Sequence, residues 1–251
     1  MIRILEKEEV VPNVHRLVLD APDIAAKAKP GQFVILMPDE TGERVPFTLS
    51  DWDVKEGTIT IYFLELGIST MKLAAKSSGG TVHTVVGPLG RPASIEKYGT
   101  VVLAGGCYGI GGIYPLARAL REAGNRVITV IEARSKYLLY NQEALRSVSD
   151  EFHESTTDGS AGLKGKVSAV LEAFESEGRR IDMYYFIGCT FMMMNGATRV
   201  PEGPRVFVAL NALMVDGTGM CGCCRLSVGG KTKFACVDGP EFDGREVDWD
   251  L

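Results

Sequence analysis

Four of the six cysteines lie in one short stretch, "MVDGTGMCGCCRLSVGGKTKFACVDGP" (residues 214–240). Asp216, Cys221, Cys224 and Cys236 follow the C-x4-C-x2-C…C spacing of plant-type [2Fe–2S] proteins, with aspartate in the first ligand position. A carboxylate is a harder ligand than a thiolate and should alter the reduction potential of a cluster that it helps to bind. We therefore expect these four residues to hold an iron–sulfur cluster.

Two other metal sites are compatible with this stretch. A four-sulfur site would use Cys223 and leave the aspartate free, although the adjacent Cys223 and Cys224 point in different directions in most backbone conformations. A structural zinc site could use the C-x2-C knuckle, but it would usually need a second knuckle, and no histidine follows His153. Cys107 and Cys189 are interpreted as small residues that line a cofactor site.

Composition narrows the class of protein. The chain has 251 residues, a net charge of −5 and 45% hydrophobic residues, as in an ordinary globular protein. This acidic balance and the lack of a basic run argue against nucleic-acid binding. The N-terminal stretch is charged throughout, unlike a signal peptide, and no run reaches the ~18 apolar residues of a membrane span. We therefore expect a cytoplasmic protein, whose reduced cysteines are more suited to metal binding than to disulfides.

The elements that must position these residues change in type along the chain. The first hundred residues contain short β-rich runs separated by Gly, Pro and Asp turns, which predict an antiparallel barrel or sandwich. One helix is expected at 69–77, with Ser69 or Thr70 as its N-cap. Apolar strands then alternate with helices, which predicts a parallel α/β sheet. The runs are strands at 44–52, 57–66, 79–87, 100–106, 126–134, 183–188 and 205–210, and helices at 112–124 and 166–178.

The sequence thus predicts a β-barrel followed by an α/β domain and a Cys-rich C-terminal extension. We place the barrel at residues 1–97, the nucleotide-binding domain at 98–210 and the cluster-binding segment at 211–251.

Glycines between a strand and a helix indicate a dinucleotide site in the α/β domain. The stretch "LAGGCYGIGGIYPLARAL" would let the backbone approach a pyrophosphate, with a helix N-terminus supplying N–H donors. Its G-x-G-x-x-G spacing is only approximate, so a simple tight turn is the alternative. The glycines are Gly105, Gly106, Gly109, Gly111 and Gly112.

Two further loops and one strand end would meet the glycine-rich stretch at the same sheet edge. Glu132 could accept hydrogen bonds from an adenosine ribose, which favours NAD, or could be a surface charge at the strand end. Arg134 and Lys136 could instead meet a 2′-phosphate. The loop 155–165, which includes Asp158, and the loop 188–190 complete the set.

In the barrel, Arg44, Pro46 and Thr48 alternate along a strand, so their side chains share one face. Such a face could bind a phosphate and the edge of an isoalloxazine, or could simply be an exposed polar face. Gly67 and the hydroxyls after it stand at a helix start, which is a second anion-binding position.

Together these motifs resemble the ferredoxin–NADP reductase superfamily, in its dihydroorotate dehydrogenase electron-transfer-subunit branch, over essentially the whole chain. The strand at 44–48 and the turn at 67–70 match flavin-binding motifs, and "VGPLG" (86–90) matches the turn that closes the FAD domain. The stretch 104–112 and the loop 188–190 match nicotinamide-nucleotide motifs, although the latter reads Gly-Cys-Thr where the family usually has Cys-Gly-Pro.

The resemblance implies FAD, NAD(H) and a [2Fe–2S] cluster in this chain, with no side chain acting as catalytic acid or base. Asp216 stands where the dihydroorotate dehydrogenase branch has a cysteine. In this respect the chain resembles a sister group, the small subunits of NADH-dependent reduced ferredoxin:NADP oxidoreductases. The cofactor contacts that it implies are Arg44, Pro46, Phe47, Thr48, Leu64, Gly67, Ser69, Thr70, Gly105, Gly106, Gly109, Gly111, Glu132, Arg134, Asp158, Gly188 and Cys189.

The function implied is electron transfer between NAD(H), FAD and the cluster, within a heterodimer. The expected partner is a larger flavoprotein with iron–sulfur clusters, similar to the small subunit of glutamate synthase, through which ferredoxin would react. Two alternatives stay open: the electron-transfer subunit of dihydroorotate dehydrogenase, and a non-catalytic redox sensor whose cysteines hold zinc.

Overall fold

The computed structural model describes residues 1–250 and divides the chain into two compact units. The first comprises residues 1–93, 212–226 and 232–240, and the second comprises 94–211, 227–231 and 241–250. The C-terminal stretch, which was expected as a third region, is therefore distributed between the two units.

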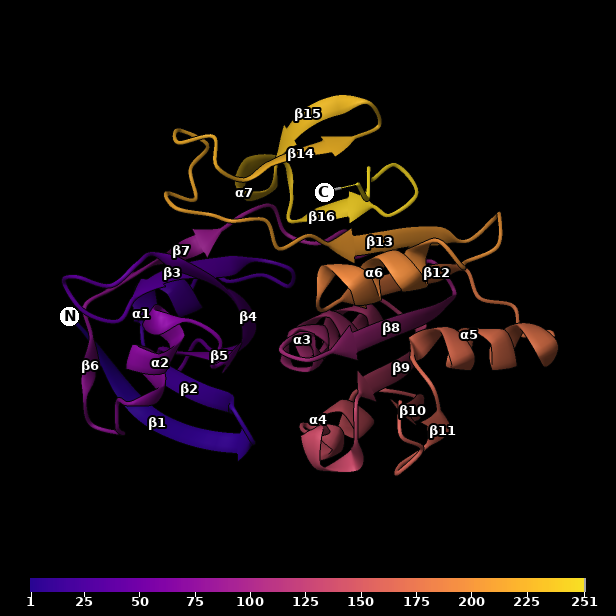
Figure 1. The fold of residues 1–251 in the computed structure, drawn as a ribbon, viewed down its shortest axis with the longest axis horizontal. Coiled ribbons are helices and arrows are strands. Elements are labelled where there is room, and N and C mark those ends of the chain that lie inside the picture. The colour runs from indigo at the N-terminus through magenta and orange to yellow at the C-terminus, as the bar shows by residue number, and fades with distance from the viewer. Residues whose placement is uncertain (251) are drawn as a thin grey trace. The chain divides into compact units, whose positions relative to one another are not determined.

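The first unit is built on a seven-stranded antiparallel sheet with the order β6-β1-β2-β5-β4-β3-β7 (Figure 1). Its two edge strands, β6 and β7, are separated by the single residue His83, so the sheet must curl until its edges nearly meet. This curled half-barrel confirms the predicted antiparallel barrel. The strands are β1 (Ile2–Val11), β2 (Val14–Asp20), β3 (Phe33–Met37), β4 (Val45–Asp53), β5 (Thr58–Leu64), β6 (Thr81–Val82) and β7 (Thr84–Leu89).

A continuous apolar core fills the curled sheet. Leu17, Leu49 and Ile61 are fully buried in it, and the short helices α1 (Pro22–Ala25) and α2 (Ile68–Ala74) each contribute side chains. The expected N-cap of α2 was wrong by two or three residues. Gly67 is the N-cap, and the hydroxyl of Thr70 accepts hydrogen bonds from the N–H groups of Gly67 and Leu66.

The second unit contains a seven-stranded sheet with the order β11-β10-β9-β8-β12-β13-β16. All neighbouring strands are parallel except the edge pair β13 and β16, which is antiparallel. The strands are β8 (Thr100–Gly106), β9 (Arg126–Ala133), β10 (Glu151–Thr156), β11 (Leu163–Lys164), β12 (Met183–Ile187), β13 (Arg205–Ala209) and β16 (Glu241–Asp243). The predicted parallel sheet is confirmed.

The strand order reverses at β8, which lies between β9 and β12. Helix α3 (Gly109–Glu122) packs on the strands on either side of this point, and α5 (Val167–Ser176) and α6 (Thr190–Ala197) pack on each other. The connection through α3 leads from β8 toward one edge of the sheet, and those through α5 and α6 lead to β12 and β13 toward the other edge. Because such connections are right-handed, α3 lies on one face of the sheet and α5 and α6 lie on the opposite face. Open α/β sheets bind ligands at the carboxyl ends of strands at such a reversal, here the ends of β8 and β12.

The remaining elements are short. They are the 3₁₀ turn η1 (Lys136–Leu138), α4 (Gln142–Ser147), the hairpin strands β14 (Arg225–Val228) and β15 (Lys231–Phe234), and α7 (Ala235–Asp238). Across residues 1–250, no helix is long and apolar enough to cross a membrane.

Candidate functional site

The loop that carries the predicted cluster ligands is seated on the curled sheet. Gly217 has a φ of +75°, and a Cβ there would lie 2.6 Å from Leu89 Cδ1 and 2.7 Å from Ile35 Cδ1. Only glycine combines this left-handed conformation with so close an approach to β3 and β7. The sequence therefore fixes the loop against the sheet one residue after Asp216.

Asp216 shapes the loop that follows it. Its carboxylate accepts hydrogen bonds from the backbone N–H groups of Thr218 (2.8 Å), Gly219 (3.3 Å) and Cys221 (2.6 Å). The bond from Thr218 is the largest cause that lowers the pKa of Asp216 below its usual value. Asp216 is therefore an ionised acceptor that folds residues 216–221 into a compact turn.

The predicted ligands form two close pairs. Cys224 and Cys236 are buried, their Sγ atoms are 3.2 Å apart, and the Cys236 N–H group lies 3.5 Å from Cys224 Sγ. Asp216 and Cys221 form the second pair through the hydrogen bond described above, and Cys221 is exposed. No group of three or more His, Cys, Asp or Glu residues within residues 1–250 stands in metal-binding geometry. The donor set of three thiols and one carboxylate nevertheless fits an iron–sulfur cluster in type and spacing.

The predicted flavin strand lies in β4, in the same unit as this loop. Pro46 and Thr48 are half-buried, whereas Phe47 between them is 8% exposed and packs in the core against Phe63. Pro46 and Thr48 therefore lie on the less buried face of β4, Arg44 directly precedes the strand, and Phe47 points away from that face. Arg44 Nε donates to the carbonyl of Val215 at 2.7 Å, which links this strand to the loop.

The second predicted flavin motif forms the turn before α2. Ser69 is buried, and its hydroxyl accepts from the Glu43 N–H group at 3.2 Å. The Thr70 hydroxyl is held within the turn, and Leu64 is half-buried at the end of β5. Gly67 is exposed, and a Cβ there would meet no atom within 4 Å. The turn therefore offers backbone groups, while its two hydroxyls already have partners.

The glycine-rich stretch joins β8 to α3, as predicted, at the reversal of strand order. A Cβ at Gly109 would lie 2.1 Å from the carbonyl oxygen of Ile187, so only glycine lets α3 begin this close to β12. Gly105 and Gly106 end β8, and Gly111 is buried in the first turn of α3. These residues bring a helix N-terminus to the carboxyl ends of the strands.

Two tyrosines that sequence analysis missed hold this stretch in place. Tyr108 donates to the Gly188 carbonyl at 2.7 Å, and Tyr140 donates to the Cys107 carbonyl at 2.9 Å. Tyr140 also accepts from the Gly111 N–H group at 3.2 Å. The tyrosine in "GCYG" was a visible signal, but the role of Tyr140, 33 residues away from Cys107, depends on tertiary contact.

The predicted adenosine-binding residues have partners within the second unit. The Glu132 carboxylate accepts from the N–H group of Val167, the first residue of α5, and burial is the main cause that raises its pKa. Asp158 accepts from the hydroxyl (2.6 Å) and the N–H group (2.9 Å) of Ser160, and the hydroxyl bond is the largest cause that lowers its pKa to about 2. Arg134 is exposed.

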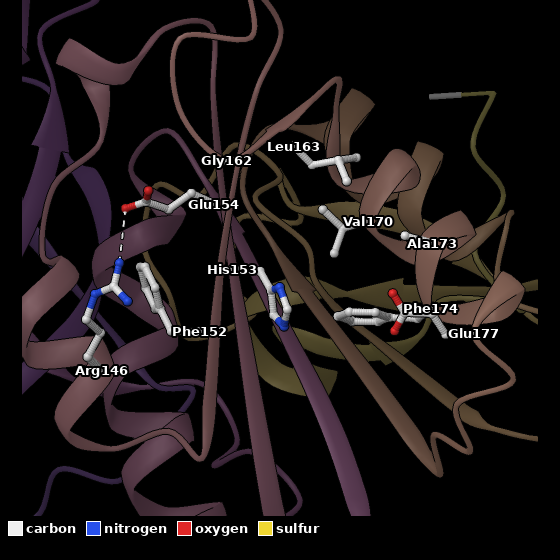
Figure 2. A pocket seen from close by; sticks show the side chains of 10 residues that line it. All are labelled: Arg146, Phe152, His153, Glu154, Gly162, Leu163, Val170, Ala173, Phe174 and Glu177. Atoms are coloured by element: carbon white, nitrogen blue, oxygen red, sulfur yellow. Dashed lines mark ion pairs between the residues drawn. The ribbon is translucent and has the colours of Figure 1, made fainter.

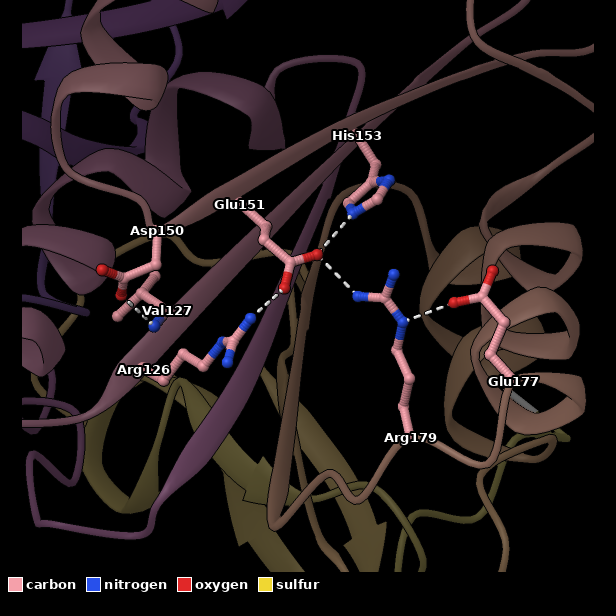
Figure 3. Close-up of polar contacts among 7 residues, drawn as sticks. All are labelled: Arg126, Val127, Asp150, Glu151, His153, Glu177 and Arg179. Carbon is pink, nitrogen blue, oxygen red and sulfur yellow. Dashed lines mark hydrogen bonds and ion pairs between the residues drawn. The ribbon is translucent and has the colours of Figure 1, made fainter.

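Two other polar features of this unit include none of the predicted cofactor residues. Glu151 pairs with Arg126 and Arg179, each at 2.6 Å, and with His153 at 3.3 Å (Figure 3). A pocket of about 320 Å³ lies between β10, β11 and α5, and Arg146 stacks on Phe152 at its edge (Figure 2). Its lining includes His153, Glu154, Leu163, Phe174 and Glu177.

Known proteins resemble the chain in sequence and in fold. Residues 211–248 match the family profile of the iron–sulfur cluster binding domain of dihydroorotate dehydrogenase B. The chain is 44% identical to the dihydroorotate dehydrogenase B (NAD(+)) electron transfer subunit homolog of Thermotoga maritima, over 98% of this chain and 87% of that protein. It is 32% identical to the corresponding electron transfer subunit of Bacillus caldolyticus, over 95% and 94%.

A solved structure agrees over the full length. This structure of an NADH-dependent reduced ferredoxin-NADP oxidoreductase, studied for flavin-based electron bifurcation, matches with a TM-score of 0.95 and 42% identity, over 100% of this chain and 90% of that one. The electron-transfer function and the flavin, iron–sulfur and nicotinamide cofactor classes predicted from the sequence are confirmed at the level of family and fold. The chain belongs to the family of dihydroorotate dehydrogenase B electron transfer subunits and their homologues.

Proposed function

We propose that this chain is the small subunit of an electron-bifurcating NADH-dependent ferredoxin:NADP oxidoreductase. In this proposal it holds FAD on the curled sheet, NAD(H) at the carboxyl ends of β8 and β12, and a [2Fe–2S] cluster at Asp216, Cys221, Cys224 and Cys236. When bound, FAD exchanges electron pairs with nicotinamide and single electrons with the cluster.

One observation carries the proposal. The Arg44 side chain, directly before the strand with the flavin motif, donates to the carbonyl of Val215, and Val215 directly precedes Asp216. Both elements belong to the first unit, so the proposed flavin face and the proposed cluster loop are joined by a single hydrogen bond. Among residues 1–250, Arg44 makes this bond through its Nε atom, which leaves its terminal nitrogens to bind an anion such as a phosphate.

The residues of the cluster loop would hold the metal in different ways. The buried Cys224 and Cys236 supply a close thiol pair, and the N–H group of Cys236 already points to Cys224 Sγ. Backbone N–H groups directed at sulfur stabilise the thiolate form and tune the potential of such a site. Cys221 and Asp216 supply the more exposed side, where a carboxylate ligand would shift the potential relative to a thiolate.

The dinucleotide would be held mainly by backbone groups. The N-terminus of α3 lies at the carboxyl end of β8, where its dipole would favour a pyrophosphate. A side chain at Gly106 would fill this region, because its Cβ would already lie 3.5 Å from Met192 Cγ and 3.7 Å from Glu132 Cγ. The exposed Arg134 lies where an adenosine phosphate or ribose would bind, two residues after Glu132. Cys189, the N-cap of α6, would lie beside the nicotinamide.

The surface of this chain around the cluster loop is suited to binding a large partner. Apolar side chains are exposed beside the proposed ligands: Leu213 is 71% exposed, Met220 is 90% exposed and Val237 is 40% exposed. An apolar rim around a redox centre is typical of a binding surface for a protein partner. We infer that a larger flavoprotein with iron–sulfur clusters, similar to the small subunit of glutamate synthase, covers this rim, and that ferredoxin reacts through that partner.

Anaerobic purification of the complex tests the proposal directly. We expect iron and sulfide in equal amounts, FAD in the small subunit and bleaching of the flavin absorbance when NADH is added. A preparation that contains zinc without iron or sulfide would support a redox sensor instead, and one without flavin would refute the proposal.

A second candidate is the electron-transfer subunit of a dihydroorotate dehydrogenase, which is favoured by the names of the two relatives and of the matching domain. Co-purification from native extract distinguishes the two candidates. A dihydroorotate-oxidising partner would support this second candidate, whereas a glutamate-synthase-like flavoprotein would support the first.

A further inference from the structure

Two cysteines that are not predicted cluster ligands lie at the reversal of strand order. Ile187 is the register partner of Gly105 in the parallel pair β12 and β8. Cys107 and Cys189 each lie two residues beyond these partners, in the loops that leave the carboxyl ends of β8 and β12. The two paired strands are about 4.8 Å apart, so the loops begin within the Cα separation that a disulfide spans.

The two loops stay together beyond the last paired residues. A Cβ at Gly188 would lie 2.9 Å from the carbonyl oxygen of Gly106, so the two backbones are in contact there. The Tyr108 hydroxyl donates to the Gly188 carbonyl at 2.7 Å and ties the residue after Cys107 to the residue before Cys189. The two thiols interact with each other, and both residues are exposed.

The environment makes the two thiols unequal. Cys189 is the N-cap of α6, and the hydrogen bond from Cys107, supported by N–H groups of the first turn, lowers the pKa of Cys189 to about 6. The same pairing raises the pKa of Cys107 well above its ordinary value. The pairing and the helix N-terminus therefore favour the thiolate at Cys189 over Cys107, as in a nucleophile with a resolving partner.

We propose that Cys107 and Cys189 form a dithiol that hydroperoxides oxidise reversibly to a disulfide, in competition with the dinucleotide. The Cys189 thiolate attacks the peroxide O–O bond, giving a sulfenic acid and hydroxide. The Cys107 sulfur then displaces the hydroxyl from Cys189, so an S–S bond forms and water leaves. Two electrons pass from the two sulfurs to one peroxide, and an external dithiol restores the reduced pair. The competition rests on the proposed function, which places the dinucleotide at these two loops.

Peptide mapping by mass spectrometry tests the disulfide without any activity assay. The full chain, prepared anaerobically with its cofactors, is treated with hydrogen peroxide, alkylated and digested. We expect a cross-linked peptide that contains Cys107 and Cys189, has lost two hydrogens and disappears after treatment with dithiothreitol. If Cys189 passes to sulfinic acid with no cross-link to Cys107, the proposal is wrong.

Single variants separate the two roles. Cys107→Ser should accumulate a sulfenic acid at Cys189 that dimedone labels, and Cys189→Ser should leave Cys107 unoxidised at the same peroxide dose. The exposed Cys223 provides an internal control for general thiol oxidation. The assigned roles are refuted if dimedone labels Cys107 in Cys189→Ser as strongly as it labels Cys189 in Cys107→Ser.

NADH protection tests the competition. At ten times its Kd, NADH should slow disulfide formation about tenfold, because only the unliganded fraction reacts. If NADH binds but gives no protection, the competition is refuted. If NADH does not bind and the disulfide still forms, the dithiol stands and the proposed function fails.

Discussion

Glu132 gives the sharpest single test of how the second unit is built. Its carboxylate accepts from the N–H group of Val167 at the start of α5, and the N-cap residue of that helix, Lys166, makes no side-chain capping bond. Glu132 therefore caps α5 from the neighbouring strand β9. Losing a helix cap costs about 1 kcal/mol.

We therefore expect Glu132→Ala to lower the free energy of unfolding by about 1 kcal/mol. Glu132→Gln should behave differently, because it keeps an acceptor for Val167 and removes a charge. Burial raises the folded-state pKa of Glu132, so this carboxyl contributes less to stability as the pH rises through that pKa. At neutral pH the Gln variant should therefore match the wild type within about 0.5 kcal/mol.

The assay is urea denaturation of the three proteins at neutral pH, with hydrogen exchange of the first-turn amides of α5 as the local readout. Faster exchange at Val167 is expected in Glu132→Ala alone. Equal stability of the Ala variant and the wild type, or equal losses in the Ala and Gln variants, would refute the capping role. Binding of NADH and NADPH is measured in parallel. If Glu132 also contacts the ribose, Glu132→Gln should weaken NADH binding relative to NADPH while the protein stays stable.

Three other perturbations probe the rest of the chain. Glu151→Gln removes the charge that pairs with Arg126 and Arg179. It should destabilise the second unit by only about 1 kcal/mol in urea denaturation, because both arginines are partly exposed to solvent. The wild-type advantage should disappear as the pH falls from about 4.5 to about 2, since the hydrogen bond from Arg179 is the main cause that lowers the pKa of Glu151 to about 2. Met220→Asp should weaken assembly with the large subunit in gel filtration while the iron content is unchanged. Asp216→Cys should keep a cluster with a shifted reduction potential, whereas an unchanged EPR spectrum in Asp216→Ala would exclude aspartate as a ligand.

The parallel strands were predictable because their burial on both faces produces continuous apolar runs. "TVVLAGG" predicts β8 with its observed bounds, and "RVITVIEAR" predicts β9 to within one residue. The C-terminal strands β14, β15 and β16 have three or four residues each and no clear periodicity. Strand β16 is specified by its antiparallel pairing with β13, which short-range pattern does not reveal.

For the candidate site, the spacing of residue types predicts which side chains could act but says little about their contacts. Spacing alone proposes Asp216 and the cysteines of the loop as a donor set. It does not reveal that Gly217 seats the loop on Ile35 and Leu89, because that contact joins segments more than a hundred residues apart. For Phe47, the match to a flavin motif gave no information about side-chain direction, and strand alternation turns this residue into the core.

The carboxylates predicted to meet a ligand share one property that sequence analysis did not anticipate. Asp216, Glu132 and Asp158 each already accept a backbone N–H group of this chain. An ionised carboxylate has about four acceptor positions, so these bonds fix its direction and leave capacity for a metal ion or a ribose hydroxyl. A binding group whose direction is fixed before the ligand arrives loses less conformational freedom on binding. Capping a loop or helix and binding a cofactor are therefore compatible tasks for the same side chain, and only variants that keep the acceptor but remove the charge can separate them.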